Sequence, residues 1–221
     1  MFKKLGWDPI KDFAPVAMLT RAPQLIAVRP GLPVNSLQEL IQYAKSNPGK
    51  LNYGSAGSGS IQHIAGELLG QMTGISMTHI PYKGAAPAVQ DMLGGSVDLV
   101  ITAPATLISQ IQAGRLKGLA VASSKRLASL PNVPTAAEAG LSGYELDSWF
   151  ALYAPAGTPP EIIRQLNGEV NKILQMPEIR RRAEEAGTTV DIMTPQRLAE
   201  FTHSELERWG KVIKDAGISA E

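Results

Sequence analysis

A loop of small residues, from Gly54 to Ser60, carries the clearest chemical signal in the sequence. It reads Gly-Ser-Ala-Gly-Ser-Gly-Ser and holds three glycines and three serines between a predicted strand and a predicted helix. Glycine lets the backbone approach a ligand closely, and the first turn of a helix offers unpaired N–H groups with a partial positive charge. Serine hydroxyls add donors. The loop therefore predicts an anion site without lysine or arginine; the alternative is a tight turn of small residues that serves packing.

Known phosphate-binding loops do not fit this spacing. A P-loop ends in Gly-Lys-Ser/Thr, and this loop has no lysine. A dinucleotide-binding fingerprint that used Gly57 and Gly59 would need a third glycine where Gln62 stands. A carboxylate therefore fits the loop at least as well as a phosphate does.

Two more strand-to-helix junctions, Tyr82-Lys83-Gly84 and Thr102-Ala103, could meet the loop. Ligands of open α/β sheets lie outside the carboxyl ends of the strands, so the three junctions could converge on one cleft. Every α/β fold has such junctions, however, and a solvated role for Lys83 agrees equally well with the sequence.

His63 and Glu67 stand one helical turn apart, just inside the predicted helix. A zinc protease would need two histidines at this spacing, so we expect no metal. We expect a surface pair, or a histidine that bonds to local backbone, and no catalytic role. His63 remains a candidate ligand contact because it lies close to the loop.

Composition and missing motifs exclude several classes of function. The 221 residues are 44% apolar and 19% charged, as in a folded chain, and no run of eighteen apolar residues occurs. The formal net charge of +1 gives no basic excess for binding nucleic acid. Cysteine is absent, no Gly-x-Ser-x-Gly elbow is present, and no nucleophile–base pair stands out. We therefore expect a protein that is not an enzyme and has no cofactor.

Strand and helix patterns alternate along the chain, which predicts an α/β fold with a largely parallel sheet. Capping boxes predict a helix start at Ser36 and the start of a very short helix at Thr135, and Thr158 is expected to cap a helix with Pro159 at its first position. The expected strands are 25–28, 51–54, 76–81, 97–102, 116–122 and 188–192, and residues 144–154 are expected to form a long strand or an extended segment that crosses between domains. The main expected helices are 36–47, 60–73, 87–93, 104–113, 158–175, 177–186 and 194–216. The expected buried face of helix 158–175 is Ile162, Ile163, Leu166, Val170, Ile173 and Leu174.

The order and spacing of several short motifs resemble one known family over essentially the whole chain. The sequence is similar to the Bug-type periplasmic substrate-binding proteins of tripartite tricarboxylate transporters. The motifs are Trp7-Asp-Pro-Ile-Lys-Asp-Phe-Ala-Pro-Val16, Leu51-Asn-Tyr-Gly-Ser-Ala-Gly-Ser-Gly-Ser60 with His63, Pro81-Tyr-Lys-Gly84, Gly95-Ser-Val-Asp-Leu99, Gly114-Arg-Leu-Lys-Gly-Leu-Ala-Val121, Leu130-Pro-Asn-Val-Pro-Thr135, and Ser148-Trp-Phe150 with Pro155-Ala-Gly-Thr-Pro159.

This resemblance implies a type II periplasmic-binding-protein fold, with two α/β domains and the ligand in the cleft between them. It implies a periplasmic protein that captures a small carboxylate, such as a di- or tricarboxylate or an aromatic acid, and hands it to a membrane permease. Residues 25–143 would form the second domain, and residues 1–24 and 144–221 the first. The candidate ligand-binding residues are Ser55, Ala56, Gly57, Ser58, Gly59, Ser60, His63, Tyr82, Lys83, Gly84, Thr102 and Ala103.

Two differences from the family alter these expectations. Members normally have a strand, a Gly-rich loop and a helix before the region of Trp7, so we expect an incomplete first domain and weak binding of carboxylates. We also expect either a homo-oligomer formed through open apolar surface or a poorly stable chain. Met1–Lys4 resembles the charged start of a signal peptide, but no apolar run follows. Many members have Asp-Asn where this chain has Thr102-Ala103, and the loss of that aspartate disfavours ligands with an ammonium group.

Two other classes of protein stay open. A ligand-sensing regulatory domain of the LysR type shares the binding fold, but the sequence shows no helix-turn-helix and no basic face. A small α/β enzyme that acts on an anionic substrate is the other alternative, and the missing nucleophile–base pair counts against it.

Overall fold

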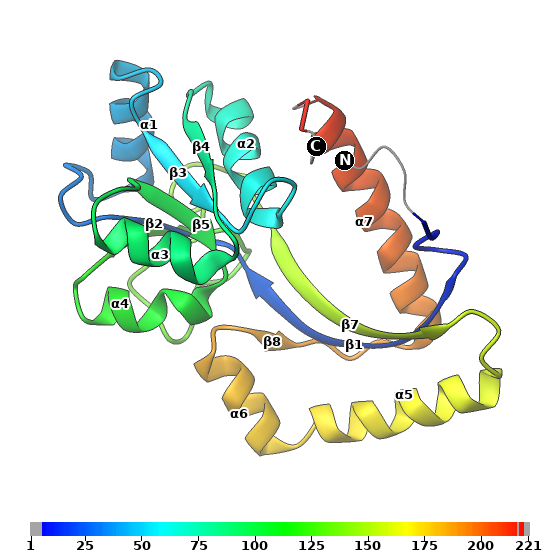
Figure 1. The fold of residues 1–221 in the computed structure, drawn as a ribbon. Coiled ribbons are helices and arrows are strands. Elements are labelled where there is room, and N and C mark those ends of the chain that lie inside the picture. Colours follow the sequence, from blue (N-terminus) through cyan, green and yellow to red (C-terminus); the bar gives the residue numbers. More distant parts are fainter. Residues whose placement is uncertain (1–5, 216, 219–221) are drawn as a thin grey trace.

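The chain forms two β-sheets and passes between them twice, at residue 24 and again between residues 121 and 147 (Figure 1). The structure, a computed structural model, describes residues 6–215 and 217–218, so the charged Met1–Lys4 segment lies outside the described residues. One sheet has the order β7-β1-β8, and the other has the order β4-β3-β5-β2-β6. The strands are β1 (Phe13–Pro23), β2 (Leu25–Val28), β3 (Asn52–Ser55), β4 (Thr78–Pro81), β5 (Leu99–Thr102), β6 (Lys117–Val121), β7 (Asp147–Pro155) and β8 (Thr189–Val190).

The expectation of a largely parallel sheet is correct for only part of the structure. Strand β3 runs parallel to its neighbours β4 and β5, but β2 is antiparallel to β5 and β6, and β1 is antiparallel to β7 and β8. A single residue, Gln24, separates β1 from β2, so the chain enters the five-stranded sheet without a crossover helix. The five-stranded sheet is built from residues 25–121 and the three-stranded sheet from residues outside that range. The domain boundaries at 24/25 and 143/144 stay a prediction.

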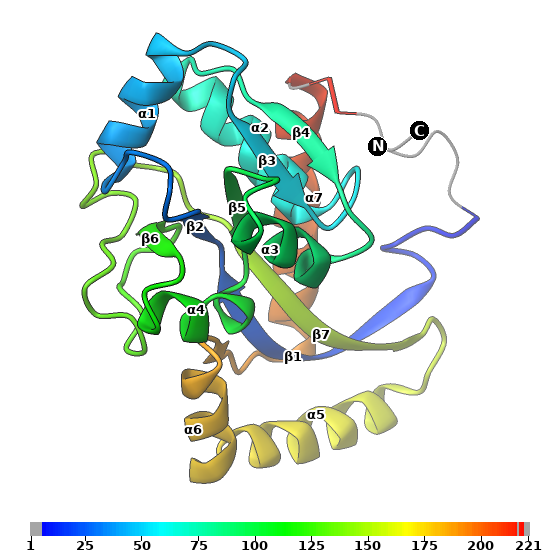
Figure 2. The same cartoon turned by 60° about the vertical axis from the view of Figure 1, so that its left-hand side comes forward.

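Helices cover both faces of each sheet (Figure 2). In the five-stranded sheet, one apolar core joins the strands to α1 and α2, and a second joins them to α3 and the turn at Leu107. In the three-stranded sheet, α5 packs on Val16 and Ala17, and α7 packs on Met18 from the opposite face. The helices are α1 (Leu37–Ser46), α2 (Ile61–Thr73), α3 (Ala85–Leu93), the 3₁₀ turn η1 (Pro104–Thr106), α4 (Ile108–Gln112), α5 (Pro160–Leu174), α6 (Pro177–Glu185) and α7 (Pro195–Asp215).

Both predicted capping boxes form, but only the one at Ser36 begins a helix. The Ser36 hydroxyl accepts from the Glu39 amide at 3.1 Å, and the Glu39 carboxylate accepts from the Asn35 amide at 2.6 Å, so α1 begins as predicted. Thr135 and Glu138 make the same reciprocal bonds, at 3.1 and 2.8 Å, but only turns follow. Gly140, with a φ of 83°, takes the left-handed conformation and ends this segment after one turn.

Two other predicted starts are wrong by one or two residues. Helix α3 begins at Ala85, and Pro87 lies in its first turn, where its missing N–H costs no helical bond. Helix α5 begins at Pro160 after Pro159. Thr158 does not cap it, because its hydroxyl donates to the Pro155 carbonyl at 2.8 Å.

The predicted buried face of α5 is only partly buried. Ile163 and Leu174 are buried, but Ile162, Leu166 and Ile173 are 42%, 40% and 49% exposed. The apolar stripe is therefore wider than the strip of α5 that contacts β1. Phe150 and Leu152, on strand β7 at the edge of the three-stranded sheet, are also exposed, at 61% and 40%. Exposed apolar side chains therefore lie on both α5 and β7.

Candidate functional site

The three strand-to-helix junctions lie side by side at one edge of the five-stranded sheet. Strand β3 lies between β4 and β5 and runs parallel to both, so their carboxyl ends meet at the same edge. The Tyr82 amide donates to the Ser55 carbonyl at 3.0 Å, and the Gln62 amide group lies 3.5 Å from the Thr102 hydroxyl. The structure therefore brings together the segments that the sequence singled out.

Inside the Gly54–Ser60 loop, two of the serine hydroxyls are used to hold the loop itself. Ser55 Oγ accepts from the Gly57 amide at 3.1 Å, and Ser60 Oγ donates to the Gly57 carbonyl at 2.7 Å. The same Ser60 hydroxyl caps α2 by accepting from the His63 amide at 3.3 Å. Gly57 and Gly59, with φ of 126° and 77°, take conformations that favour glycine. The Ser55 and Ser60 hydroxyls are thus engaged within the loop and the helix cap, and the prediction that these two residues bind a ligand stays untested.

Backbone amides are the donors that the loop leaves unpaired. Within the part of the chain that the structure describes, the N–H groups of Ala56, Ser58, Ile61 and Gln62 have no hydrogen-bond acceptor. Ile61 and Gln62 form the first turn of α2, a helix of thirteen residues, and Ser58 is exposed. Unpaired amides and the positive end of a helix dipole together attract an anion. This is the part of the loop that can bind a carboxylate.

The other candidate residues surround the loop in different ways. The Tyr82 hydroxyl donates to Asp91 at 2.7 Å, and burial, together with this carboxylate, raises the pKa of Tyr82 to about 12. Lys83 is exposed, and Gly84, with a φ of 123°, precedes α3. Thr102 is only 2% exposed, and the Ala103 carbonyl accepts from the Thr106 hydroxyl at 3.1 Å. Tyr82 thus directs its hydroxyl toward α3, while Thr102 lies at the buried end of β5.

Two stacked histidines, His63 and His79, contact residues of the Gly54–Ser60 loop. The rings of His63 and His79 lie 3.8 Å apart between centroids, with 8° between their planes. His63 Nδ1 accepts from the Gly59 amide at 3.1 Å, and His79 Nε2 lies 2.6 Å from Ser55 Oγ. His63 thus bonds to local backbone, as one of the sequence alternatives held. His79 was not singled out from the sequence, because its position beside the loop depends on the pairing of Tyr53 with His79 in the sheet.

The environment of both histidines favours the neutral imidazole. Burial lowers the pKa of His63, and the nearby Glu67 carboxylate partly offsets this effect. Burial, followed by repulsion from His63, lowers the pKa of His79 to about 4. The short contact between Ser55 and His79 has the length of a nucleophile–base pair, which the sequence did not predict. Ser55 is only 1% exposed, however, and its hydroxyl oxygen also binds the Gly57 amide, so the contact holds the loop.

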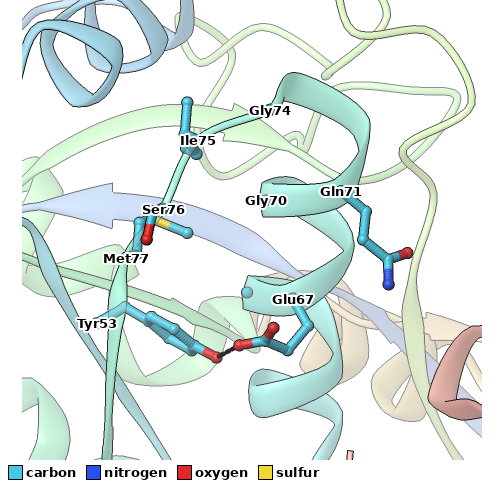
Figure 3. Close-up of a pocket in the computed structure, with 9 residues that line it drawn as sticks. Tyr53, Glu67, Gly70, Gln71, Gly74, Ile75, Ser76 and Met77 are labelled. Atoms are coloured by element: carbon cyan, nitrogen blue, oxygen red, sulfur yellow. Dashed lines mark hydrogen bonds between the residues drawn. The ribbon is translucent and has the colours of Figure 1, made fainter. Parts of the chain in front are cut away.

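Two cavities flank α2. One, of about 400 Å³, is lined by Tyr53 and Glu67, whose side chains share a hydrogen bond of 2.7 Å (Figure 3). The other, of about 700 Å³, is mostly apolar and lies between the start of α2 and the β7–α7 region, with Ile61, Ser148 and Trp209 among its lining residues. The second cavity therefore begins at the first residue of α2, next to the loop.

The residues that the structure describes contain neither a metal-binding group of side chains nor a helix that could span a membrane. Among residues 6–215 and 217–218, no group of three His, Cys, Asp or Glu side chains is placed to hold a metal ion. Over the same residues, no helix has the length and apolar character needed to cross a membrane.

The arrangement of the two sheets is that of a periplasmic binding protein. A solved structure of the periplasmic binding protein BugD is 32% identical, with a TM-score of 0.89 over 99% of this chain and 74% of that chain. The family model of the tripartite tricarboxylate transporter family receptor matches residues 1–218, and the chain belongs to this family. The family and the fold predicted from the sequence motifs are confirmed.

Two further solved structures contain a dicarboxylate. A protein from R. palustris with adipate is 40% identical, with a TM-score of 0.92 over 99% of this chain and 73% of that chain. MatC from Rhodopseudomonas palustris with bound malate is 35% identical, with a TM-score of 0.86 over 96% of this chain and 73% of that chain. The chain spans about two thirds of the length of the curated relatives that it matches.

Proposed function

We propose that this chain captures a small carboxylate in the periplasm and delivers it to the membrane permease of a tripartite tricarboxylate transporter. The observation that carries the proposal is the set of unpaired amides at Ala56, Ser58, Ile61 and Gln62, where the loop meets the positive end of α2. The family description as a receptor supports a binding role rather than a catalytic one. The adipate and malate found in two relatives support a dicarboxylate, and tricarboxylates and aromatic acids belong to the same proposal.

The proposed binding mode needs no cationic side chain in the loop. One ligand carboxylate accepts hydrogen bonds from the free amides, each a charge-assisted bond that contributes roughly 1.5–3 kcal/mol. The Ser58 hydroxyl, which lies on the exposed part of the loop, supplies a further donor. The rest of the ligand lies in the cleft between the two domains, with Thr102 and Ala103 at its inner end.

A pair of matched aspartate substitutions tests the loop. We expect Ser58→Asp to weaken binding of adipate and malate at least tenfold, because it places a negative charge among the amides. Ser96→Asp is the control, because Ser96 is also exposed but precedes the first residue of β5. It therefore lies at the end of this strand that is opposite to Thr102. Calorimetric titration at pH 8 measures both, and equal affinity in the two variants would remove the loop from the site. Valine at Gly57 or Gly59 is a poorer test, because the positive φ of these residues strains any side chain.

Thr102 carries the proposed selectivity. It is buried and uncharged at the end of β5, so a ligand ammonium group would lie near it without a partner. We expect succinate to bind more tightly than aspartate, which has the same carbon chain with an amino group. Tighter binding of aspartate in the same titration would contradict this role of Thr102.

We also propose that copies of the chain associate through the apolar face of Phe150, Leu152, Ile162 and Leu166. These four side chains are each at least 40% exposed. Strand β7, which carries Phe150 and Leu152, pairs with β1 on one side and is the edge of its sheet. An exposed apolar edge strand promotes association.

A further inference from the structure

We propose that His63 is the positioning residue of the carboxylate loop, and that the loop holds its ligand only while Nδ1 of His63 carries no proton. Acidification would then release the carboxylate. This inference rests on the proposed function and adds a mechanism of regulation to the same site.

The bond between His63 and the loop fixes the state of the ring. The Gly59 amide donates to Nδ1 at 3.1 Å, so Nδ1 must offer a lone pair. In a neutral imidazole the hydrogen then lies on Nε2, the nitrogen that lies 3.9 Å from the Glu67 carboxylate. The negative charge of Glu67 favours this tautomer.

The two stacked rings hold the loop at both ends. His79 contacts Ser55 at the start of the loop, and His63 contacts Gly59 near its end. The unpaired amides of Ala56 and Ser58 lie between these two anchors in the chain. The orientation of the proposed ligand donors therefore depends on the histidine pair.

Protonation of His63 would replace an acceptor by a donor. An N–H at Nδ1 would face the Gly59 N–H at a distance that leaves no room for both hydrogens, so the loop or the ring must move. The titratable groups that face the ring are His79 from β4, Tyr53 from β3, which donates to Glu67, and Glu67 from α2 itself. With ring centroids 3.8 Å apart, a charge on one imidazole opposes a charge on the other, so the pair takes up one proton before it takes up two.

Protons can reach this cluster from solvent. Glu67 is 34% exposed, and with Tyr53 it lines the cavity of about 400 Å³ on the far side of α2 (Figure 3). His63, whose side chain is 12% exposed, lies between this carboxylate and the loop. The cluster thus connects the partly exposed Glu67 carboxylate, through His63, to Gly59 of the loop.

The sign and the size of the effect follow from linkage. Because the binding-competent form has a neutral His63, the competent fraction falls as pH falls through the pKa of His63, which burial lowers below the ordinary 6.5. Apparent affinity falls with that fraction, by about tenfold for each pH unit below the pKa. A cation that merely attracted the ligand would give the opposite sign, with tighter binding in acid.

Two substitutions at His63 test the proposal. His63→Asn places an amide oxygen close to the position of Nδ1 and cannot titrate, so its affinity should fall less than that of the wild type between pH 8 and pH 5. His63→Leu removes the acceptor and should bind weakly at every pH. Adipate is the probe, titrated calorimetrically between pH 8 and pH 5. Protonation of adipate itself affects every variant equally, so the ratio of wild type to His63→Asn isolates His63.

A measurement without ligand separates this inference from the proposed function. The amide resonance of Gly59 in ¹⁵N-labelled protein should shift on acidification in the wild type and stay in place in His63→Asn. If adipate and malate fail to bind at pH 8, the dicarboxylate part of the proposed function is wrong, and the Gly59 resonance still decides whether protonation releases the loop. Parallel pH profiles of wild type and His63→Asn, tighter binding of the wild type in acid, or an unmoved Gly59 resonance would each overturn the inference.

Discussion

Gly66, in the middle of α2, is the position where adding a single methyl group should do the most damage. A Cβ at this residue would lie 2.3 Å from Cε2 and 2.4 Å from Cζ of the Tyr53 ring. Such distances are far below van der Waals contact. The ring is fully buried against β3 and α2, and its hydroxyl donates to Glu67 at 2.7 Å, so moving the ring away from α2 breaks this hydrogen bond. Gly66→Ala must therefore push α2 away from β3 or expel the ring.

The expected cost is a balance of three effects. Alanine in place of glycine favours a helix by about 1 kcal/mol. Overpacking a filled core costs about 1–3 kcal/mol, and loss of the hydrogen bond from Tyr53 to a charged carboxylate costs about 1.5–3 kcal/mol. We expect Gly66→Ala to lower the free energy of unfolding by about 2–4 kcal/mol. Because α2 also carries His63 and the free amides of Ile61 and Gln62, adipate binding should weaken with it.

Gly168→Ala in α5 is the matched control. A Cβ there meets no atom within 4 Å, so the same substitution should raise the free energy of unfolding by about 0.5–1 kcal/mol. Urea unfolding followed by circular dichroism compares the two variants with the wild type. Equal stability of Gly66→Ala and Gly168→Ala would refute the tight packing of Tyr53 on α2, and with it the rigid placement of the loop.

Three further predictions concern other parts of the molecule. Asp98 is 9% exposed and accepts hydrogen bonds from Arg29 at 2.9 Å and from the Asn52 amide at 3.0 Å. Asp98→Ala should therefore lower the free energy of unfolding, measured in urea, by about 3 kcal/mol or more, and a loss below about 1 kcal/mol would contradict this prediction. Burial lowers the pKa of His79 to about 4 in the folded state, against 6.5 in the unfolded chain, so acidification between these values protonates the unfolded chain first and lowers stability. Thermal melts should show a smaller loss of stability over this pH range in His79→Gln than in the wild type. Identical pH profiles of the two proteins would argue against a buried neutral His79. Replacing Phe150 and Leu152 with serine should dissociate the proposed oligomer in light scattering, and a wild type that is already monomeric would remove that proposal.

Local signals in the sequence predicted the elements whose cause is local. The Ser36–Glu39 spacing located the start of α1, because both bonds of the cap lie within one turn. Two glycines of the loop, Gly57 and Gly59, also take a positive φ, which glycine adopts without strain. The same spacing at Thr135 misled, because it specifies the cap and not the length of the turn that follows.

The features that the sequence could not supply depend on contacts between distant segments. His79 reaches Ser55 because β4 pairs with β3 in one register, and a shift by one residue would turn its side chain to the other face. The periodicity of α5 marks an apolar stripe but does not say how much of it a neighbour covers, and Ile162 and Ile173 are exposed. The inward direction of the Ser55 and Ser60 hydroxyls follows from the folded loop, not from residue type.

The same loop chemistry bears on how a receptor releases its cargo. A lysine or arginine in the loop would attract a carboxylate at every physiological pH, and the Gly54–Ser60 loop contains neither. Backbone amides bind a carboxylate only in the orientation that the loop gives them, so anything that moves the loop weakens binding. In this structure that orientation depends on His63 and His79, two neutral side chains that stack behind the loop. In the proposed binding mode, a site built from amides can thus hold an anion firmly and still release it when a small local change turns the amides away, which a fixed cation in the loop would oppose.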